Sequence, residues 1–152
     1  MNAFLDHPEQ WATLVDDPSG TIGTATEEVL RWASPVMYFR RNVTKDTEVR
    51  GQMIEAGEKV SIWYVSANRD EEVFDDPFRF DVLRTPNDHI AFGGGGPHFC
   101  LGASLARLEI KVVFEELAKR VPTLVRAGDA DRLRSNFIGG IKHLPVDLSA
   151  AR

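Results

Sequence analysis

The feature that most constrains this chain is a glycine-rich loop that carries its only cysteine and runs directly into a long helix. Four consecutive glycines, residues 93–96, precede Cys100, and a helix is predicted over 103–120. A helix N-terminus offers positive potential and free N–H groups, which favour the thiolate form of a cysteine. Glycines let backbone amides approach the sulfur, because no side chain blocks them. The loop therefore predicts a thiolate that suits a soft or borderline metal such as iron.

Three other interpretations of the loop compete with an iron site. A lone cysteine is most often a small buried apolar residue. A glycine-rich loop before a helix can bind phosphate, but no Gly-Lys-Ser/Thr follows here. A zinc site needs about four ligands, and one cysteine with four scattered histidines lacks their usual spacing. The order of the loop argues against an ordinary buried cysteine, because Phe92 precedes the four glycines, His98 lies two residues before Cys100 and Gly102 lies two residues after it.

Composition and charge exclude several classes of protein. The 152 residues suffice for one domain with a core, and 43% hydrophobic and 27% charged residues are typical of a globular protein. A net charge of −5 without a basic block argues against general nucleic-acid binding. No stretch approaches the roughly 18–20 apolar residues of a membrane span, and residues 1–10 lack the pattern of a signal peptide. The expected compartment is therefore the cytoplasm.

Hydrophobic periodicity and turn signals predict a mainly α fold with small β-sheets, of the α+β class. The predicted helices are 2–15, 24–33 and 103–120. The predicted strands are 36–43, 47–49, 53–54 and 59–66. Thr24 is expected to cap the second helix with Glu27 three residues later. Residues 67–86 are predicted as irregular, and Gly139-Gly140 as the turn of a C-terminal hairpin between 137–138 and 141–146.

The order of residues in the cysteine loop resembles the heme-binding loop of the cytochrome P-450 family, whose pattern is Phe-Gly-x-Gly-x-His/Arg-x-Cys-x-Gly. The matching residues are Phe92, Gly93, Gly96, His98, Cys100 and Gly102. One departure is the spacing, because Phe92 lies eight residues before Cys100 where seven is usual. A similar longer loop occurs in the actinobacterial members that oxidise sterols and methyl-branched lipids. The resemblance implies that residues 1–152 are the C-terminal, heme-ligand portion of that fold.

The resemblance implies heme b as the cofactor and Cys100 as the axial thiolate ligand of its iron, and so as the catalytic and metal-binding residue. A thiolate ligand pushes electron density onto the iron and favours O–O cleavage. Phe92 is then expected to pack on the ligand side of the heme, and His98 to reach a heme propionate. Gly93 and Gly102 complete the cofactor-binding loop.

In the family an arginine also binds a heme propionate, and either Arg40 or Arg41 matches that position. Counting back from Gly51 favours Arg41, whereas counting forward from Arg31 favours Arg40, and we choose Arg41. Neighbouring residues on a strand face opposite sides, so only one of the two suits the role. The residues expected to line the substrate side are Val36, Met37, Tyr38, Phe137 and Ile138, with ordinary core packing as the alternative.

A second motif, Glu28-x-x-Arg31, places two opposite charges on one face of a helix. On a surface such a pair contributes under about 1 kcal/mol. Followed by the irregular segment and the cysteine loop, it resembles the family's Glu-x-x-Arg motif, in which the pair binds an arginine of that segment. Arg79 matches this arginine, so the three residues are predicted to form a structural network. Loss of one member strands a buried charge and costs roughly 3–5 kcal/mol.

The resemblance implies an oxidoreductase of the monooxygenase type, which inserts one atom of dioxygen into a lipophilic substrate such as a sterol or a branched lipid. A ferredoxin or similar protein is the expected electron donor, with Arg107 and Lys111 as candidates for a basic docking face. The family's N-terminal portion, with its oxygen-activating helix, is expected to be absent. The alternative is a truncated, non-catalytic fragment that binds heme weakly or not at all unless the missing half complements it.

Overall fold

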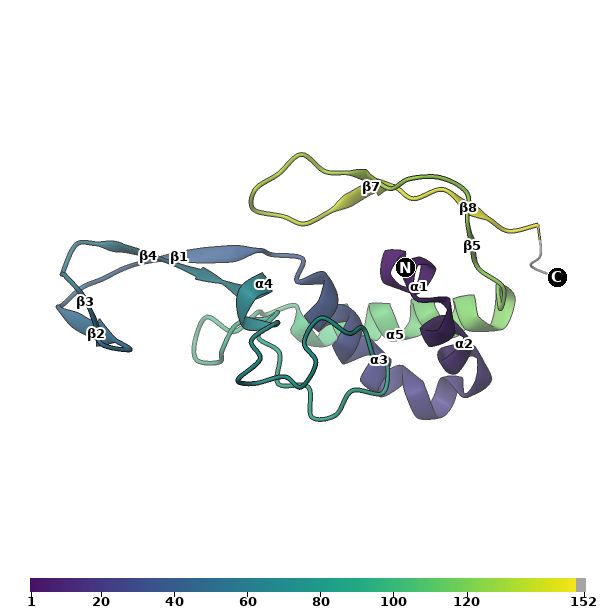
Figure 1. Cartoon of the computed structure of the whole chain (residues 1–152), viewed down its shortest axis with the longest axis horizontal. Helices are drawn as coiled ribbons and strands as arrows, with labels where there is room; N and C mark the ends of the chain where they lie inside the picture. Colours follow the sequence, from purple (N-terminus) through teal and green to yellow (C-terminus); the bar gives the residue numbers. More distant parts are fainter. Residues whose placement is uncertain (150–152) are drawn as a thin grey trace.

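Two long helices, α3 (Pro18–Ala33) and α5 (Ala103–Arg120), pack against each other, and the other elements are arranged around them (Figure 1). The structure is a computed structural model, and it describes residues 1–149. The shorter helices are α1 (Asn2–Asp6), α2 (Pro8–Asp16) and α4 (Tyr64–Ala67). The strands are β1 (Tyr38–Asn42), β2 (Thr47–Val49), β3 (Gln52–Ile54), β4 (Lys59–Trp63), β5 (Val125–Arg126), β6 (Asp131–Arg132), β7 (Ile141–His143) and β8 (Val146–Asp147). Within residues 1–149 the strands form small two-stranded antiparallel sheets, so the predicted class is confirmed.

The helix α3 begins earlier than predicted. The carboxylate of Asp17 accepts a hydrogen bond from the amide of Gly20 (3.0 Å), and Pro18 occupies the first turn. Both features favour a helix start, since aspartate caps free amides and proline has no amide to leave unpaired. Thr24 lies inside the helix, where its hydroxyl donates to the carbonyl of Thr21 (3.0 Å). The predicted capping box that starts at Thr24 is therefore wrong.

A hairpin formed by β1 and β4 projects from the C-terminal end of α3, and β2 and β3 continue it outward (Figure 1). Tyr38 pairs with Trp63 at the base of this hairpin. The predicted strand over 59–66 is too long, because β4 ends at Trp63 and α4 follows at once. The amide of Tyr64 donates to the carbonyl of Met37 (2.9 Å), which fixes the start of α4 beside β1.

The C-terminal segment pairs with a distant part of the chain rather than only with itself. β6 and β7 are joined by a loop over 133–140, so the predicted tight turn at Gly139-Gly140 is wrong. The amide of Gly139 donates to the carbonyl of Pro35 (2.8 Å), and the amide of Met37 donates to the carbonyl of Phe137 (3.0 Å). This non-local pairing lays the loop against the segment that leads from α3 into β1.

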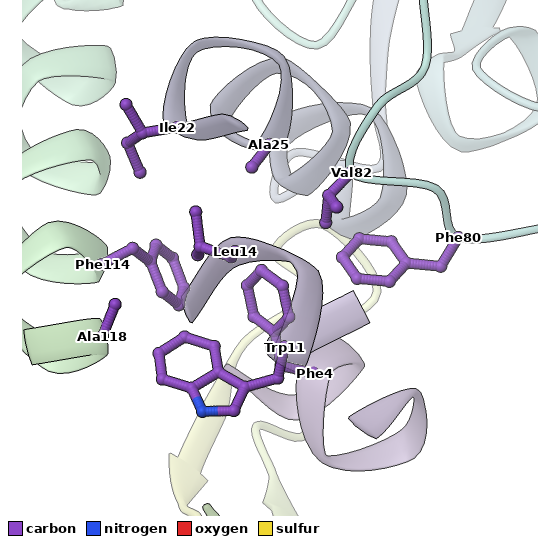
Figure 2. Close-up of a cluster of buried hydrophobic side chains, with 9 residues drawn as sticks. All are labelled: Phe4, Trp11, Leu14, Ile22, Ala25, Phe80, Val82, Phe114 and Ala118. Carbon is purple, nitrogen blue, oxygen red and sulfur yellow. The ribbon is translucent and has the colours of Figure 1, made fainter. Parts of the chain in front are cut away.

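The core lies between α1, α2, α3 and α5, with two side chains of the irregular segment inserted into it (Figure 2). Its buried members are Phe4, Trp11, Leu14, Ile22, Ala25, Phe80, Val82, Phe114 and Ala118. The Phe4 ring meets three other rings of this set edge to face, with centroid distances of 5.1, 5.2 and 5.3 Å. Because Phe80 and Val82 belong to the irregular segment, the core anchors this segment without any regular secondary structure.

One face of α5, together with Leu101 two residues before the helix, is apolar and exposed in the described part of the chain. Its large side chains, with exposed fractions of 47% or more, are Leu101, Leu105, Leu108, Val112 and Val113. The buried residues of α5 are Ala103, Phe114 and Ala118, so the helix contacts the core along a narrow stripe. None of the helices in residues 1–149 combines the length and apolar character needed to cross a membrane.

Leu14 is fully buried in the core, whereas Leu105 on α5 is 60% exposed. We expect Leu14→Ala to lower the free energy of unfolding by roughly 2–5 kcal/mol, because the change leaves a cavity among closely packed rings. Leu105→Ala is the matched control and should change it by less than about 0.5 kcal/mol. Urea denaturation followed by tryptophan fluorescence measures both variants. Equal losses in the two variants would contradict the core described here.

Candidate functional site

A cavity of about 520 Å³ lies between the end of α3, the β1–β4 hairpin, α4 and the cysteine loop. It is lined by Leu30, Pro35, Val36, Phe39, Arg41, Tyr64, Ala91, Phe92, His98 and Cys100. Most of these residues are apolar, and the polar ones come from several separate segments. An apolar cavity with a few convergent polar groups is the usual form of a small-molecule or cofactor site.

The cysteine loop is held by its own backbone. The amide of Cys100 donates to the carbonyl of Phe92 (3.0 Å), which closes the loop although eight positions separate the two residues. Gly93 and Gly96 have φ angles of 95° and 77°, a region that residues with a side chain rarely adopt. Gly102 ends the loop, and a Cβ there would lie 3.9 Å from the sulfur of Cys100. The glycines therefore set the path that presents Cys100.

The side chains predicted to bind the cofactor come together at this cavity. Phe92, His98 and Cys100 line it from the loop, and Cys100 is a free, exposed cysteine. Arg41 lines it from β1, far away in the sequence, whereas Arg40 does not line it. This difference follows from the alternation of side chains along a strand. The geometry therefore favours Arg41 over Arg40 for contact with a group in the cavity.

Of the residues predicted to line the substrate side, only Val36 lines this cavity. Tyr38 instead packs on the ring opposite it on β4, with centroids 4.7 Å apart, and Phe137 packs against Phe39 at 5.5 Å. Phe39 is the aromatic residue of β1 that lines the cavity. The alternation of side chains along a strand could have predicted Phe39 as a lining residue, because Phe39 and Arg41 are two residues apart and lie on the same face of β1.

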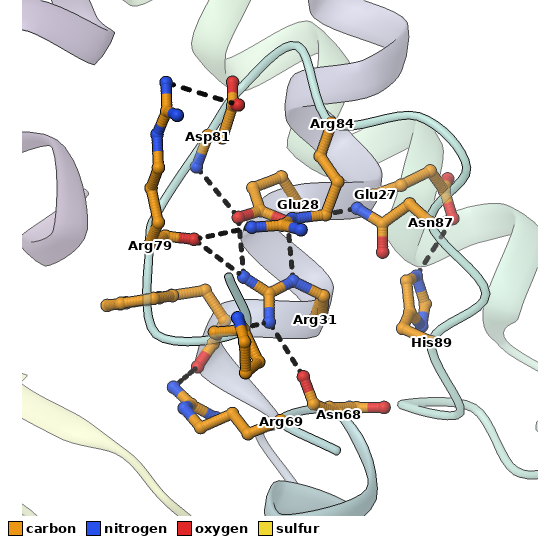
Figure 3. A network of polar contacts seen from close by, with 12 residues as sticks. Glu27, Glu28, Arg31, Asn68, Arg69, Arg79, Asp81, Arg84, Asn87 and His89 are labelled. Atoms are coloured by element: carbon orange, nitrogen blue, oxygen red, sulfur yellow. Dashed lines mark hydrogen bonds and ion pairs between the residues drawn. The ribbon is translucent and has the colours of Figure 1, made fainter. Parts of the chain in front are cut away.

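The predicted ion pair of Glu28 and Arg31 is present and fully buried (Figure 3). Arg31 Nε donates to Glu28 Oε2 (2.7 Å), and Nη2 donates to Oε1 (2.8 Å). The same guanidinium donates to the carbonyls of Asn68 (2.8 Å), Pro77 (2.9 Å) and Arg79 (3.1 Å). These hydrogen bonds offset the free-energy cost of removing the two charges from water. One arginine side chain therefore fixes three points of the irregular segment.

The prediction that the side chain of Arg79 completes this network is wrong. Its side chain is 61% exposed, its guanidinium lies 3.6 Å from the Asp81 carboxylate, and only its backbone carbonyl contacts the pair. Arg84 takes the predicted place, with Nε 3.2 Å from Glu28 Oε2 and a side chain that is 9% exposed. This N–H is not aligned for a hydrogen bond, but the Nη atoms of Arg84 donate to three carbonyls of the irregular segment. The path of that segment, which spacing alone does not give, decides which arginine reaches Glu28.

Asn68 connects the buried pair to the cysteine loop, and its role was not predicted. Its side chain is fully buried, and its amide group donates to the hydroxyl of Ser34 (2.9 Å). Its carbonyl Oδ1 accepts a hydrogen bond from the amide of Ile90 (2.8 Å), while its backbone carbonyl accepts one from Arg31. The sequence offers one signal for this role, because Asn68 is a polar residue at the point where a predicted strand ends and the irregular segment begins. Asn68 thus fixes the chain directly before the loop.

A second polar cluster, formed by Glu27, His89 and Arg107, lies beside the cysteine loop and was also not predicted. Figure 3 shows two of its members, Glu27 and His89. Glu27 accepts two hydrogen bonds from Arg107 on α5, at 2.7 and 2.8 Å. Its Oε2 lies 3.0 Å from His89 Nε2. Because His89 Nδ1 accepts from the amide of Ala91 (3.2 Å), the network assigns the ring hydrogen to Nε2, which donates to Glu27. Arg107, a candidate for a docking face, is thus paired with a carboxylate.

The charges of this cluster follow from its surroundings. Burial lowers the pKa of His89, and the hydrogen bond and charge of Glu27 offset this only in part. Partial burial raises the pKa of Glu27, but the hydrogen bonds and charges of Arg107 and His89 outweigh burial and leave this pKa below its ordinary value. At neutral pH the cluster therefore holds one carboxylate, one guanidinium and a neutral imidazole.

Comparison with known proteins gives the family. The family model described as Cytochrome P450 matches residues 24–129, which is more than half of the chain. The chain belongs to the cytochrome P450 family, as its cysteine loop and Glu-x-x-Arg motif predict.

Individual relatives are oxidative enzymes of this family. A methyl-branched lipid omega-hydroxylase of Mycobacterium tuberculosis is 55% identical over 147 residues, which are 97% of this chain and 34% of that protein. A steroid C26-monooxygenase of Rhodococcus jostii is 46% identical over 151 residues, which are 99% of this chain and 31% of that protein. The structure of a Mycobacterium marinum cytochrome P450 in complex with pseudoionone is 48% identical with a TM-score of 0.90, over 95% of this chain and 34% of that chain. This chain therefore spans about a third of the length of these relatives.

The roles of Arg84 and Arg79 are separated by matched substitutions. We expect Arg84→Met to lower the free energy of unfolding by about 1.5–3 kcal/mol, because it removes hydrogen bonds of a charged group that is nearly buried. Arg79→Met leaves the carbonyl of residue 79 in place and should change it by less than about 0.5 kcal/mol. Urea denaturation measures both. A larger loss in Arg79→Met than in Arg84→Met would restore the original prediction.

Acid is expected to destabilise the fold through His89. Its pKa in the folded chain lies below the ordinary value of 6.5, so the unfolded chain takes up this proton first as the pH falls. The free energy of unfolding should therefore decrease as the pH falls through 6.5, the ordinary value for a histidine. The pKa of Glu27 is also lowered, from 4.5, so protonation of its carboxylate should decrease the free energy of unfolding further at lower pH. His89→Gln cannot take up the proton, so its curve, measured by urea denaturation at a series of pH values, should be flatter as the pH falls through 6.5. An unchanged slope would contradict this assignment.

Proposed function

We propose that this chain provides the thiolate-ligand side of a cytochrome P450 heme site, with Cys100 as the axial ligand. The observation that carries the proposal is the convergence of Cys100, His98 and Arg41 on one apolar cavity. The first two come from one loop and the third comes from a strand almost 60 residues earlier. A thiol that shares an apolar cavity with an imidazole and a guanidinium suits a ligand that combines an iron, two carboxylates and a flat apolar ring.

The residues at the cavity fit a heme in chemical character. Cys100 offers an accessible sulfur, and its amide is held by the carbonyl of Phe92. Arg41 and His98 offer donors to the heme carboxylates, since a guanidinium binds a carboxylate through charge-assisted hydrogen bonds. Val36, on the α3 side, belongs to the apolar wall that limits access of water. When bound, a heme supplies the activation of dioxygen and the transfer of one oxygen atom to a C–H bond.

The substrate class that we propose is lipophilic, with a branched aliphatic chain or a sterol skeleton. Support comes from two relatives, which are named for a methyl-branched lipid and for a steroid. The apolar side chains of Val36 and Phe39 on the cavity wall suit such a molecule. A ferredoxin or similar protein is the proposed electron donor. A location in the cytoplasm stays a prediction.

A second candidate is a chain that holds heme weakly unless further polypeptide covers it. The apolar face of α5 favours this candidate, because Leu105 and Leu108 are 60% and 57% exposed. Apolar side chains grouped on one face mark surfaces that other protein covers. The two candidates share the ligand Cys100 and differ in how tightly this chain alone binds heme.

The function is tested by titrating the purified full chain with hemin and recording the reduced carbon monoxide difference spectrum. We expect the Soret band of a thiolate-ligated heme in the wild-type chain, and its loss in Cys100→Ser, because oxygen is a poor substitute for the softer thiolate. Tight binding supports the first candidate, and weak binding that still depends on Cys100 supports the second. Identical spectra of the wild-type chain and Cys100→Ser would contradict both.

The same titration distinguishes the two neighbouring arginines of β1. Arg41→Met is expected to weaken hemin binding by about tenfold, which is the effect of losing one charge-assisted hydrogen bond. Arg40→Met is the matched control, since Arg40 does not line the cavity, and should leave the affinity unchanged. Equal effects of the two substitutions would argue against a role for Arg41.

A further inference from the structure

The cluster of Glu27, His89 and Arg107 does not line the cavity, but it contacts a residue that does. The guanidinium carbon of Arg107 lies 4.7 Å from the centroid of the Phe92 ring, in the geometry of a cation–π contact. The His89 ring lies 6.2 Å from the same ring, centroid to centroid. Phe92 is therefore flanked by two members of the cluster, while Glu27 holds both of them.

The cluster is more rigid than an ordinary surface ion pair. The fork of Arg107 binds both oxygens of Glu27, so the plane of the guanidinium is fixed relative to α3. The side chain of His89 is 2% exposed, and its ring uses both nitrogens, one toward Glu27 and the other toward the amide of Ala91. The backbone beside Phe92 and the ring of Phe92 are thus held from the same carboxylate.

The contact reaches the cysteine through one backbone hydrogen bond. The carbonyl of Phe92 accepts the amide of Cys100 at 3.0 Å, so a rotation of residue 92 moves the acceptor of this bond. Glu27 is next to Glu28 in α3, but the two carboxylates bind different arginines. Glu28 binds Arg84 and the side-chain amide of Asn87, and Glu27 binds His89 two residues further along (Figure 3). Glu27 alone of the two also binds Arg107 of α5.

We propose that Glu27, His89 and Arg107 are positioning residues that fix Phe92 and, through the Phe92 carbonyl, the backbone of Cys100. The importance of this positioning for heme rests on the function proposed above, but the positioning itself is a property of the chain without heme. Its physical basis is the planar guanidinium over the Phe92 ring. A lysine keeps the positive charge near Glu27 but lacks this plane and the two-pronged contact.

The test compares Arg107→Lys and Glu27→Gln with the wild-type full chain by amide hydrogen exchange, read residue by residue by NMR. We expect exchange of the Cys100 amide to rise roughly tenfold in both variants, while amides of the core around Leu14 and Phe114 change less than about twofold. Glu116→Gln is the matched control. It removes a carboxylate that pairs with two cations on the same helix α5, far from the loop, and should leave the Cys100 amide unchanged.

Arg107→Lys decides the question even if Glu27→Gln fails to fold, because Arg107 is partly exposed and keeps its charge in the variant. Exchange at Cys100 within about twofold of the wild-type rate in Arg107→Lys would overturn the proposal. An equal rise at Cys100 and in the core would also overturn it, because that result describes general stability rather than positioning. A hemin titration of the same variants separates this proposal from the heme function. A wild-type chain that binds no hemin contradicts the first candidate function, and the exchange rates still decide the positioning.

Discussion

The buried pair of Glu28 and Arg31 is the interaction on which the rest of this structure depends. Removing two charges from water is costly, and only a full set of hydrogen bonds offsets that cost. Here the offset comes from three carbonyls bound by Arg31 and from an amide, at Asp81, bound by Glu28. These partners all belong to a segment without strands or long helices. The pair therefore defines the path of a segment that regular hydrogen bonding does not define.

The order that begins at this pair extends to the cysteine loop through the amide side chain of Asn68, and Asn87 adds a hydrogen bond to Glu28 just before the loop. Asn68 accepts from Arg31 with its backbone carbonyl and from Ile90 with its side-chain oxygen. Ile90 in turn accepts the amide of Gly93, and Phe92 accepts the amide of Cys100. The sulfur is thus presented by a continuous series of hydrogen bonds that starts in α3. On the other side of the loop, the cluster around Glu27 joins the same helix to α5.

Local sequence patterns predicted the parts of the site that depend on nearby residues. The glycine loop before Cys100 and the pairing of Glu28 with Arg31 follow from short spacings. Strand alternation limits the propionate role to one of Arg40 and Arg41, and the choice of Arg41 came from the family resemblance and stays a prediction. Contacts between residues far apart in the sequence could not be predicted from such local patterns. Arg84 reaches Glu28 only because the irregular segment folds back, and Gly139 bonds to Pro35 rather than closing a tight turn. The paired acidic residues at 27 and 28 look alike in sequence, yet Glu28 binds Arg31 and Arg84, whereas Glu27 binds Arg107 of α5.

The most direct test of this account is native-state hydrogen exchange of the wild-type chain at increasing urea concentration. It follows three amides: Asp81, which donates to Glu28; Ile90, which donates to Asn68; and Cys100, which donates to Phe92. If the buried pair orders the whole series, the three amides share one opening free energy and one dependence on urea. An opening of the Cys100 and Ile90 amides at much lower free energy than that of Asp81 would show that the loop is ordered independently of the pair, and would contradict the account.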